Sequence, residues 1–301
     1  MATVNYTSGT TGPPKGVVLD HRNIVWTLES FSDTFEMDVS GFRVVSYLPM
    51  AHIAERMVSH YMATAFGFEV TTCPDTTQVV AYLTQTHPEL FFAVPRIWEK
   101  AYAPIRSAIG ADPERAAAFD AALEIGWQAS EHRARNEDLP ADLAAAFEKA
   151  DAGLAPIRQL IGLDEARTAI SGAAPIPYEI LHFFRGLGVP LSEIYGLSET
   201  TGPMTWTPFR VRIGTVGPPL PGVEVRLEED GEVSCRGGNV FRGYLDSPEK
   251  TAEVLDDDGW FHSGDIGVMD DDGYLRIVDR KKELIITAGG KNISPRTWRP
   301  P

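Results

Sequence analysis

The chain has 301 residues, enough for one large domain or two ordinary ones. Hydrophobic residues make up 43% and charged residues 23%, which is typical of a globular protein. Its formal net charge of −15 argues against a nucleic-acid-binding surface, because such surfaces need clustered lysine and arginine. No apolar run approaches the ~20 residues of a membrane span, and the N-terminus lacks the basic start and apolar core of a signal peptide. The two cysteines, Cys73 and Cys235, show no metal-binding spacing and no disulfide framework, so we expect a cytoplasmic protein.

The first motif lies between strand-like runs at residues 3–6 and 17–19, and reads TSGTTGPPKG. Glycines let backbone N–H groups approach a polyanion, hydroxyls add donors and a lysine adds positive charge, so the loop fits phosphate groups. The residues that we expect at the phosphates are Thr7, Ser8, Gly9, Thr10, Thr11, Gly12 and Lys15. Two prolines after Gly12 exclude the helix that follows a Walker-type loop. Taken alone, the stretch fits a surface loop equally well.

The next part of the chain alternates between predicted strands and helices with short links, which favours a parallel sheet with flanking helices. The predicted strands are 44–48, 70–73, 90–94, 168–171 and 189–194, and one predicted helix is 76–86. His52 follows the first of these strands. From the residues alone, a histidine that caps or packs at a strand end is the simpler interpretation.

Residues 99–163 differ in composition, because alanine and charged residues dominate. This pattern predicts amphipathic helices, and residues 136–140 divide them into two. We therefore predict a helical hairpin, inserted into the α/β region and packed on it.

Two further motifs follow predicted strands. The turn Gly172-Ala173-Ala174 has only small side chains, which leaves room for a flat ring but serves a tight turn equally well. The segment YGLSETTG occupies residues 195–202 and combines an aromatic ring, a carboxylate and hydroxyls.

The region from residue 208 onward contains short alternating runs, such as 223–227 and 232–236, separated by turns at 229–231 and 271–273. It predicts a small antiparallel sheet, in which the aspartate runs at 256–258 and 270–272 form solvated turns. The stretch GWFHSGDIG places Asp265 in this part, and DRKKELI follows at 279–285.

Together these motifs resemble the acyl-adenylate-forming, or AMP-binding, enzymes, and the helical stretch looks like that of the long-chain fatty acyl-CoA synthetases. The resemblance implies an α/β fold, with a parallel sheet, flanking helices and a helical insertion, followed by a small antiparallel β subdomain. It also implies an α/β AMP-binding subdomain at 1–205 with its insertion at about 99–163, a β subdomain at 206–278, and a hinge with the start of a lid at 279–301. Ser263 stands where the family usually has threonine, and Gly238 where it has proline.

The resemblance also implies a role for each matched residue. Lys15 would serve the outer phosphates, Thr200 the α-phosphate, and Glu199 would hold Mg²⁺, which prefers carboxylate and phosphate oxygens. The other implied contacts are Tyr195, Gly196, Gly172, Ala173 and Ala174 for adenine, Asp265 and Arg280 for ribose, and His52 for the acyl-substrate pocket.

The implied function is a long-chain fatty acid–CoA ligase that uses ATP, Mg²⁺ and coenzyme A to form acyl-AMP and then acyl-CoA. A nucleotide-binding remnant without turnover, or another adenylate former such as an aryl-CoA ligase or luciferase, remains an alternative. The family's pattern extends beyond both ends of this chain, so we expect the chain alone to show little turnover and to self-associate. The sequence is also compatible with peripheral contact between this protein and a membrane.

Overall fold

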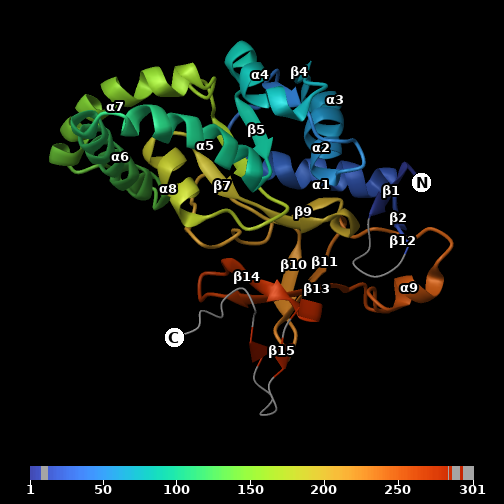
Figure 1. The fold of residues 1–301 in the computed structure, drawn as a ribbon. Helices are drawn as coiled ribbons and strands as arrows, with labels where there is room; N and C mark the ends of the chain where they lie inside the picture. Colours follow the sequence, from blue (N-terminus) through green and yellow to red (C-terminus); the bar gives the residue numbers. More distant parts are fainter. Residues whose placement is uncertain (8–12, 284, 287–291, 294–301) are drawn as a thin grey trace. The chain divides into compact units, whose positions relative to one another are not determined.

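The computed structural model describes residues 1–7, 13–283, 285–286 and 292–293, so the predicted phosphate residues Ser8 to Gly12 lie outside the described part. The chain forms two compact units, and each is described by itself. Unit 1 contains residues 1–33, 195–206 and 213–301, and unit 2 contains residues 34–194 and 207–212. Figure 1 shows their helices and strands in sequence colours.

Unit 2 contains the parallel strands that the sequence predicts. They are β3 (Arg43–Ser46), β4 (Glu69–Thr72), β5 (Leu90–Ala93), β6 (Thr168–Ser171) and β7 (Leu191–Glu193). Strand β3 pairs with β4, and β6 pairs with both β5 and β7, all in parallel. Every residue of β5 and β6 is buried, as expected for strands covered on both faces.

Helices surround these strands. They are α2 (Ile53–Arg56), the π-helical turn η1 (Met57–Met62), α3 (Ala63–Phe66), the 3₁₀ turn η2 (Thr76–Gln78), α4 (Val79–Thr86), α5 (Pro95–Gly110), α6 (Pro113–Ala134), α7 (Ala141–Leu160) and α8 (Tyr178–Gly186). The core is aromatic: the Trp98 ring packs edge-on against Phe91 and Phe184, with centroids 5.3 and 4.9 Å away.

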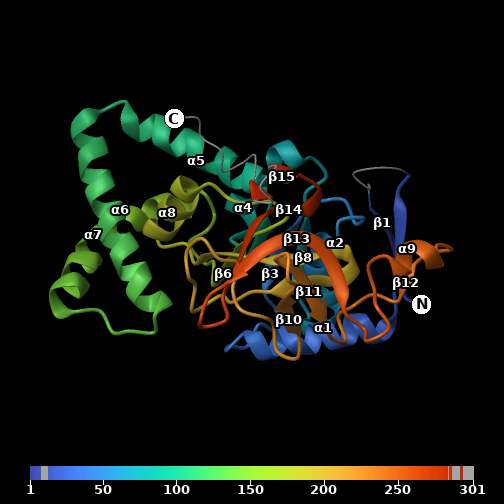
Figure 2. The same cartoon turned by 90° about the horizontal axis from the view of Figure 1, so that it is seen from below.

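The predicted helical hairpin has one helix more than expected. The break at residues 135–140 separates α6 from α7, which lie side by side in both views (Figures 1 and 2), but a second break at residues 111–112 separates α5 from α6. Asp112 caps α6 by accepting hydrogen bonds from the N–H groups of Glu114 and Arg115, and Pro113 occupies the first turn. The prediction missed this helix start because the alanines on both sides of it have high helix propensity.

Helix α6 packs closely on α8 because glycines face one another there. A Cβ on Gly126 would lie 2.0 Å from the Gly186 carbonyl oxygen, so no larger residue fits. The buried Arg185 guanidinium ties the same region together by donating to the carbonyl oxygens of Leu191 and Ser130, at 2.8 and 3.3 Å. Burial lowers the pKa of Arg185 to about 10.

Unit 1 contains the antiparallel β region that the sequence predicts. Its largest sheet has the order β10 (Glu224–Leu227), β11 (Glu232–Arg236), β13 (Phe261–Met269) and β14 (Leu275–Arg280), and all its pairs are antiparallel. In Figure 2, β13 curves across β11. The two aspartate runs form turns as predicted: Asp256 accepts from the N–H groups of Asp258 and Trp260, and Asp270 from that of Tyr274.

A second sheet of unit 1 joins distant parts of the sequence. Strands β1 (Thr3–Thr7) and β12 (Gly243–Tyr244) both pair antiparallel with β2 (Lys15–Leu19). The remaining elements are α1 (His21–Thr34), β8 (Tyr195–Leu197), the 3₁₀ turn η3 (Ser198–Thr200), β9 (Gly202–Thr205), α9 (Pro248–Ala252), the 3₁₀ turn η4 (Lys281–Glu283), β15 (Ile285–Ile286) and β16 (Asn292–Ile293). Among the described helices of both units, none is long and apolar enough to cross a membrane.

Candidate nucleotide site

The two described residues that flank the predicted phosphate loop, Thr7 and Lys15, lie on paired strands. Thr7 ends β1, Lys15 begins β2, and the two residues are direct partners in the antiparallel register. The Lys15 Nζ atom lies over the ring of Tyr244, 4.6 Å from its centroid. Among the described side chains, Lys15 has no carboxylate partner, so its charge is available to an anion.

Glu199 shares Tyr244 with Lys15. The Tyr244 hydroxyl donates a 2.8 Å hydrogen bond to Glu199 Oε1, while the Phe241 N–H donates to the Glu199 carbonyl oxygen at 2.8 Å. Within the described part of the chain, no hydrogen bond to Glu199 Oε2 is found. The half-buried Glu199 therefore has one carboxylate oxygen held and one available. Tyr244 was not among the predicted site residues, because its only local signal is a Gly-Tyr pair a few residues before a Pro-Glu helix start.

The segment around Glu199 is a tight turn built from backbone contacts. A Cβ on Gly196 would lie 1.9 Å from the Gly202 carbonyl oxygen, so packing against β9 alone requires glycine. The fully buried Thr200 hydroxyl accepts from the Leu197 N–H at 2.9 Å and lies 2.7 Å from the Gly202 carbonyl oxygen. Thr200 thus closes the turn in this structure, and its contact with an α-phosphate stays a prediction.

Asp265 and Tyr195 meet although 70 residues separate them in sequence. The Tyr195 hydroxyl donates to Asp265 Oδ2 at 2.7 Å, and Arg280 Nε lies 3.4 Å from Asp265 Oδ1. Burial, and then the Asp265 charge, raise the pKa of Tyr195, so its hydroxyl remains a donor. Three of the predicted nucleotide contacts therefore form one cluster.

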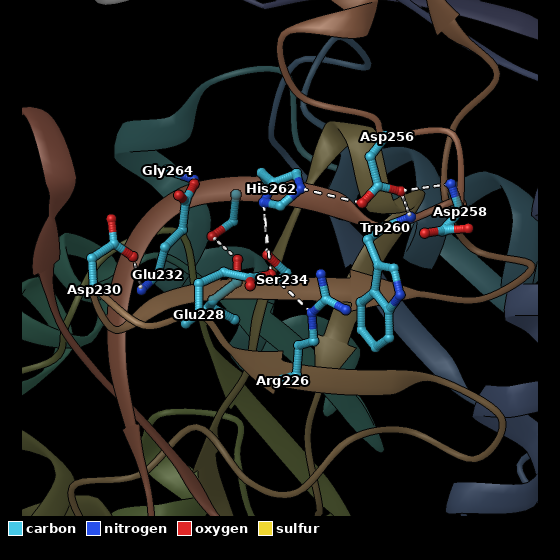
Figure 3. Close-up of polar contacts among 12 residues, drawn as sticks. Arg226, Glu228, Asp230, Glu232, Ser234, Asp256, Asp258, Trp260, His262 and Gly264 are labelled. Carbon is cyan, nitrogen blue, oxygen red and sulfur yellow. Dashed lines mark hydrogen bonds and ion pairs between the residues drawn. The ribbon is translucent and has the colours of Figure 1, made fainter.

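The backbone next to Asp265 is held by a polar network on β11 and β13. The Gly264 N–H donates to Glu232 Oε1 at 2.8 Å, and the Ser263 hydroxyl donates to the Val233 carbonyl oxygen at 2.6 Å. Figure 3 shows Glu232 and Gly264 facing each other between neighbouring strands. On its other oxygen, Glu232 accepts from Lys281 Nζ at 2.6 Å, so the start of the predicted hinge is tied to the same loop.

His262 occupies the middle of this network, between a serine and an aspartate (Figure 3). Its Nδ1 atom lies 3.0 Å from Ser234 Oγ, and its Nε2 atom lies 3.6 Å from Asp256 Oδ2. The three residue types are those of a hydrolase triad, but Ser234 is fully buried and its hydroxyl also bonds Glu228. The cluster therefore joins strands, and Ser234 is not placed as a nucleophile.

Unit 2 contains the predicted adenine turn. Gly172 follows the end of β6, where a Cβ would lie 2.7 Å from the Ile194 side chain. Ala173 adopts a φ of 68°, a left-handed conformation that costs an alanine energy and is often found at functional sites. Ala174 completes the turn. The turn is thus tight and strained. This fits both interpretations of its small residues, as room for the adenine ring and as a requirement of the turn itself.

Glu193 lies at the end of β7, opposite Ser171 in the parallel register. Burial raises the pKa of Glu193 to about 7, with a smaller opposing effect from the Ile176 N–H. Ser171 Oγ is buried and has no hydrogen-bond partner among the described atoms. Glu193 was not among the predicted site residues, because a glutamate at the end of a strand gives no local signal that its side chain is buried.

His52 begins helix α2, where its Nδ1 atom accepts a hydrogen bond from the Ala54 N–H at 3.3 Å. Its ring lies 6.3 Å from that of Phe92, at the end of β5. Burial lowers the pKa of His52, and Glu55 opposes this effect only in part. His52 is therefore a neutral helix cap whose Nε2–H points to no partner in the described structure, and its contact with an acyl substrate stays a prediction.

Unit 1 thus brings together two groups of predicted residues: Lys15 with Glu199, and Tyr195 with Asp265 and Arg280. The turn Gly172–Ala174 and His52 belong to unit 2. Among the described side chains, no three or more His, Cys, Asp or Glu gather as a metal cluster. A lone carboxylate with one available oxygen fits Mg²⁺ that takes its other ligands from phosphates and water.

Comparison with known proteins shows which family the chain resembles. The family model named AMP-binding enzyme matches residues 1–245. "Putative fatty-acid--CoA ligase fadD11" of Mycobacterium tuberculosis is 44% identical over 299 residues, which cover 98% of this chain and 52% of that protein. The mouse long-chain-fatty-acid–CoA ligase ACSBG2 is 40% identical over 308 residues, which cover 98% of this chain and 46% of that protein. The chain spans about half the length of these relatives.

Solved structures show the same fold. Apo MatB from Rhodopseudomonas palustris matches with a TM-score of 0.70 at 25% identity, covering 98% of this chain and 51% of that one. O-succinylbenzoate coenzyme A synthetase (MenE) from Bacillus subtilis, in complex with ATP and magnesium ion, matches with a TM-score of 0.69 at 24% identity, covering 98% and 53%. The α/β architecture with an antiparallel β region is common to them. The chain belongs to the AMP-binding enzyme family.

Proposed function

We propose that this chain carries the nucleotide-binding part of an ATP-dependent long-chain fatty acid–CoA ligase. In the first step, a carboxylate oxygen of the fatty acid attacks the α-phosphorus of ATP, and the bond to pyrophosphate breaks. In the second step, the thiol of coenzyme A attacks the acyl carbonyl, AMP leaves, and the thiol proton passes to solvent. Positioning and charge neutralisation supply most of the catalysis in such phosphate chemistry.

The observation that carries the proposal is the pair of charges on either side of Tyr244. Lys15 has no carboxylate partner among the described side chains, and Glu199 keeps one oxygen available. Lys15 and Glu199 both contact Tyr244, one at its ring and the other at its hydroxyl, but they do not pair with each other. This arrangement suits a phosphate and its metal ion. Mg²⁺ would neutralise the phosphate charge there, and Lys15 would bind the outer phosphates.

The other residues have proposed roles in binding the nucleoside and acyl group. Asp265 would accept hydrogen bonds from the two ribose hydroxyls, with Tyr195 bound to one of its oxygens and Arg280 near the other. The Tyr195 ring and the Gly172–Ala174 turn would contact adenine. His52, as a neutral Nε2–H donor, would face the carboxylate end of the fatty acid.

The relatives favour a fatty acid over other acyl substrates. Those at 37–44% identity are named fatty-acid–CoA ligases, whereas MenE and MatB, at 23–26%, support the fold and carry other names. The helices α5 to α7 lie in the stretch whose composition resembles the helical insertion of the long-chain branch. We therefore propose a long-chain fatty acid and coenzyme A as the co-substrates, and ATP with Mg²⁺ as the nucleotide.

Calorimetric titration with ATP and AMP, each with and without Mg²⁺, tests the proposal. Lys15→Ala should weaken ATP binding more than AMP binding, because Lys15 serves phosphates that AMP lacks. The matched control is Lys250→Ala, which removes a lysine from α9 of the same unit. Equal losses for the two nucleotides would contradict the role of Lys15, and no binding of either by the parent chain would contradict the proposal as a whole.

A pyrophosphate-release assay with palmitate, ATP and Mg²⁺ separates a ligase from a nucleotide-binding remnant. Release that depends on palmitate supports adenylation, and added coenzyme A should then yield the thioester. Nucleotide binding without any release would favour the remnant. Release with an aryl acid and none with palmitate would assign a different acyl class.

A further inference from the structure

The segment 239–245 connects the two motifs of the proposed site. Its Leu245 N–H donates to the Gly16 carbonyl oxygen at 2.8 Å, next to Lys15, and its Phe241 N–H donates to the Glu199 carbonyl oxygen at 2.8 Å. The Thr201 hydroxyl donates to the Asn239 carbonyl oxygen at 2.6 Å. The segment therefore holds the backbone of both motifs from one side, although they lie far apart in sequence.

Tyr244 is the side chain of this segment that contacts both charged groups. Its ring lies beneath Lys15 Nζ, and its hydroxyl donates to Glu199 Oε1. The residue is only 8% exposed, and three contacts fix it: pairing of β12 with β2, a 2.9 Å bond from its N–H to Thr251 Oγ1, and edge-on packing against Phe241 at 5.0 Å. Its ring and hydroxyl thus have one defined position.

The hydroxyl of Tyr244 occupies one oxygen of Glu199. At 2.8 Å from Glu199 Oε1 it forms a hydrogen bond in which the tyrosine donates and the carboxylate accepts. No hydrogen bond to Oε2 is found in the described part of the chain. Oε2 is therefore the oxygen left to a ligand.

We propose that Tyr244 is a positioning residue that sets the Glu199 carboxylate relative to the Lys15 ammonium, so that Oε2 binds the metal ion while Lys15 binds the phosphates. The inference rests on the proposed function. Tyr244 acts through Glu199 and Lys15 and touches neither metal nor nucleotide. Its hydroxyl governs the metal-dependent part of ATP binding, and its ring supports Lys15 by a cation–π contact.

The variant Tyr244→Phe tests the hydroxyl alone, because it keeps the ring. We expect the gain in ATP affinity that Mg²⁺ provides to fall by about tenfold, as for loss of one hydrogen bond to a charged group. AMP affinity without Mg²⁺ should not change. The matched control is Tyr274→Phe, which removes a hydroxyl beside the turn between β13 and β14 and should leave both affinities unchanged.

A double-mutant cycle distinguishes positioning from a structural role. If Tyr244 acts through Glu199, then Tyr244→Phe should have no further effect on the Mg²⁺ dependence in a Glu199→Gln background. A purely structural tyrosine would instead lower the melting temperature and weaken AMP and ATP alike, with or without Mg²⁺.

Three results would overturn the inference. They are an unchanged Mg²⁺ dependence in Tyr244→Phe, equal losses for AMP and ATP, and additive effects of the two substitutions. If the parent chain binds ATP but Tyr244→Phe binds it equally well, the inference fails while the proposed function stands. If the parent binds no nucleotide, both fail.

Discussion

The two units bury different kinds of side chains around their candidate residues. In unit 1 the candidates bind one another: Tyr195 donates to Asp265, and Tyr244 donates to Glu199. In unit 2 the buried contacts are mainly aromatic, as around Trp98, and the candidates Gly172 and His52 are positioned by backbone packing and a helix cap. Substitutions should therefore have their largest effect on ligand binding in unit 1 and on folding stability in unit 2.

This difference has a physical origin. Removing an aromatic ring from a packed core loses transfer free energy and leaves a cavity, which costs several kcal/mol. Removing one polar group from the unit 1 clusters leaves a buried partner without its hydrogen bond, which costs about 1–3 kcal/mol, and also removes the geometry offered to a ligand. The following predictions, in order of decreasing effect, test whether the two units separate in this way.

The largest effect is expected for Trp98→Ala in unit 2. Trp98 is 1% exposed and packs against two aromatic rings, so its loss should lower the free energy of unfolding by about 3–5 kcal/mol. Urea unfolding followed by circular dichroism measures this change. The control Leu160→Ala, at a residue that is 72% exposed, should stay close to the parent. A change under about 1 kcal/mol for Trp98→Ala would show that this core is not what stabilises unit 2.

The second effect is on binding. Asp265→Ala should weaken AMP by more than about tenfold, because a hydrogen bond to a charged group is worth about 1.5–3 kcal/mol. The same substitution should also lower the melting temperature, because Asp265 is only 5% exposed and the Tyr195 hydroxyl would lose its acceptor, but by less than Trp98→Ala. Asp271→Ala, in an exposed turn, is the control. AMP binding equal to that of the parent would remove Asp265 from the ribose site.

The third effect depends on pH and concerns Glu193 in unit 2. Its pKa is about 7 in the folded chain and near 4.5 when exposed, so between these values the folded state holds a proton that the unfolded state has lost. The stability of the parent should therefore fall as pH rises through this window, and Glu193→Gln should abolish that dependence. We expect the variant to gain about 1–3 kcal/mol over the parent between about pH 5 and pH 8.

The control for that experiment is Glu179→Gln, which changes the charge of a glutamate in the first turn of α8. Its stability should follow the same pH curve as that of the parent. Parallel curves for Glu193→Gln and the parent would mean that Glu193 is ionised across the window, and that burial does not govern its titration.

The smallest effect is expected for Lys281→Met, which breaks the contacts of Lys281 with Asp230 and Glu232 in unit 1. Both distances are 2.6 Å, but Lys281 is 45% exposed, so solvent screens much of the attraction. Unfolding free energy should fall by about 0.5–1 kcal/mol at low salt and less at high salt. Lys282→Met serves as the matched control. A loss that does not depend on salt would point to packing of the methylene stem instead.

Much of the fold could be predicted from local patterns. Apolar runs predicted the strands that became β3, β4, β5, β6 and β7, and aspartate-glycine turns predicted the hairpins of unit 1. The start of α6 was missed, although Asp112 and Pro113 signal it, because the surrounding residues all favour helix. The predicted subdomain boundaries at residues 205 and 278 remain predictions. The two compact units are each built from more than one stretch of the chain.

The sequence by itself determined which chemical groups are present: a Gly- and Thr-rich loop with Lys15, the Tyr195–Gly202 motif, and Asp265. It could do so because the residues within each motif are close together along the chain, although the motifs themselves are far apart. Only the tertiary structure decided which of them meet. Tyr195 reaches Asp265 across 70 residues, and pairing of β12 with β2 brings Tyr244 to Lys15, where its hydroxyl also reaches Glu199. Burial likewise emerges only on folding, which is why the raised pKa of Glu193 and the role proposed for Tyr244 have no counterpart in the local sequence.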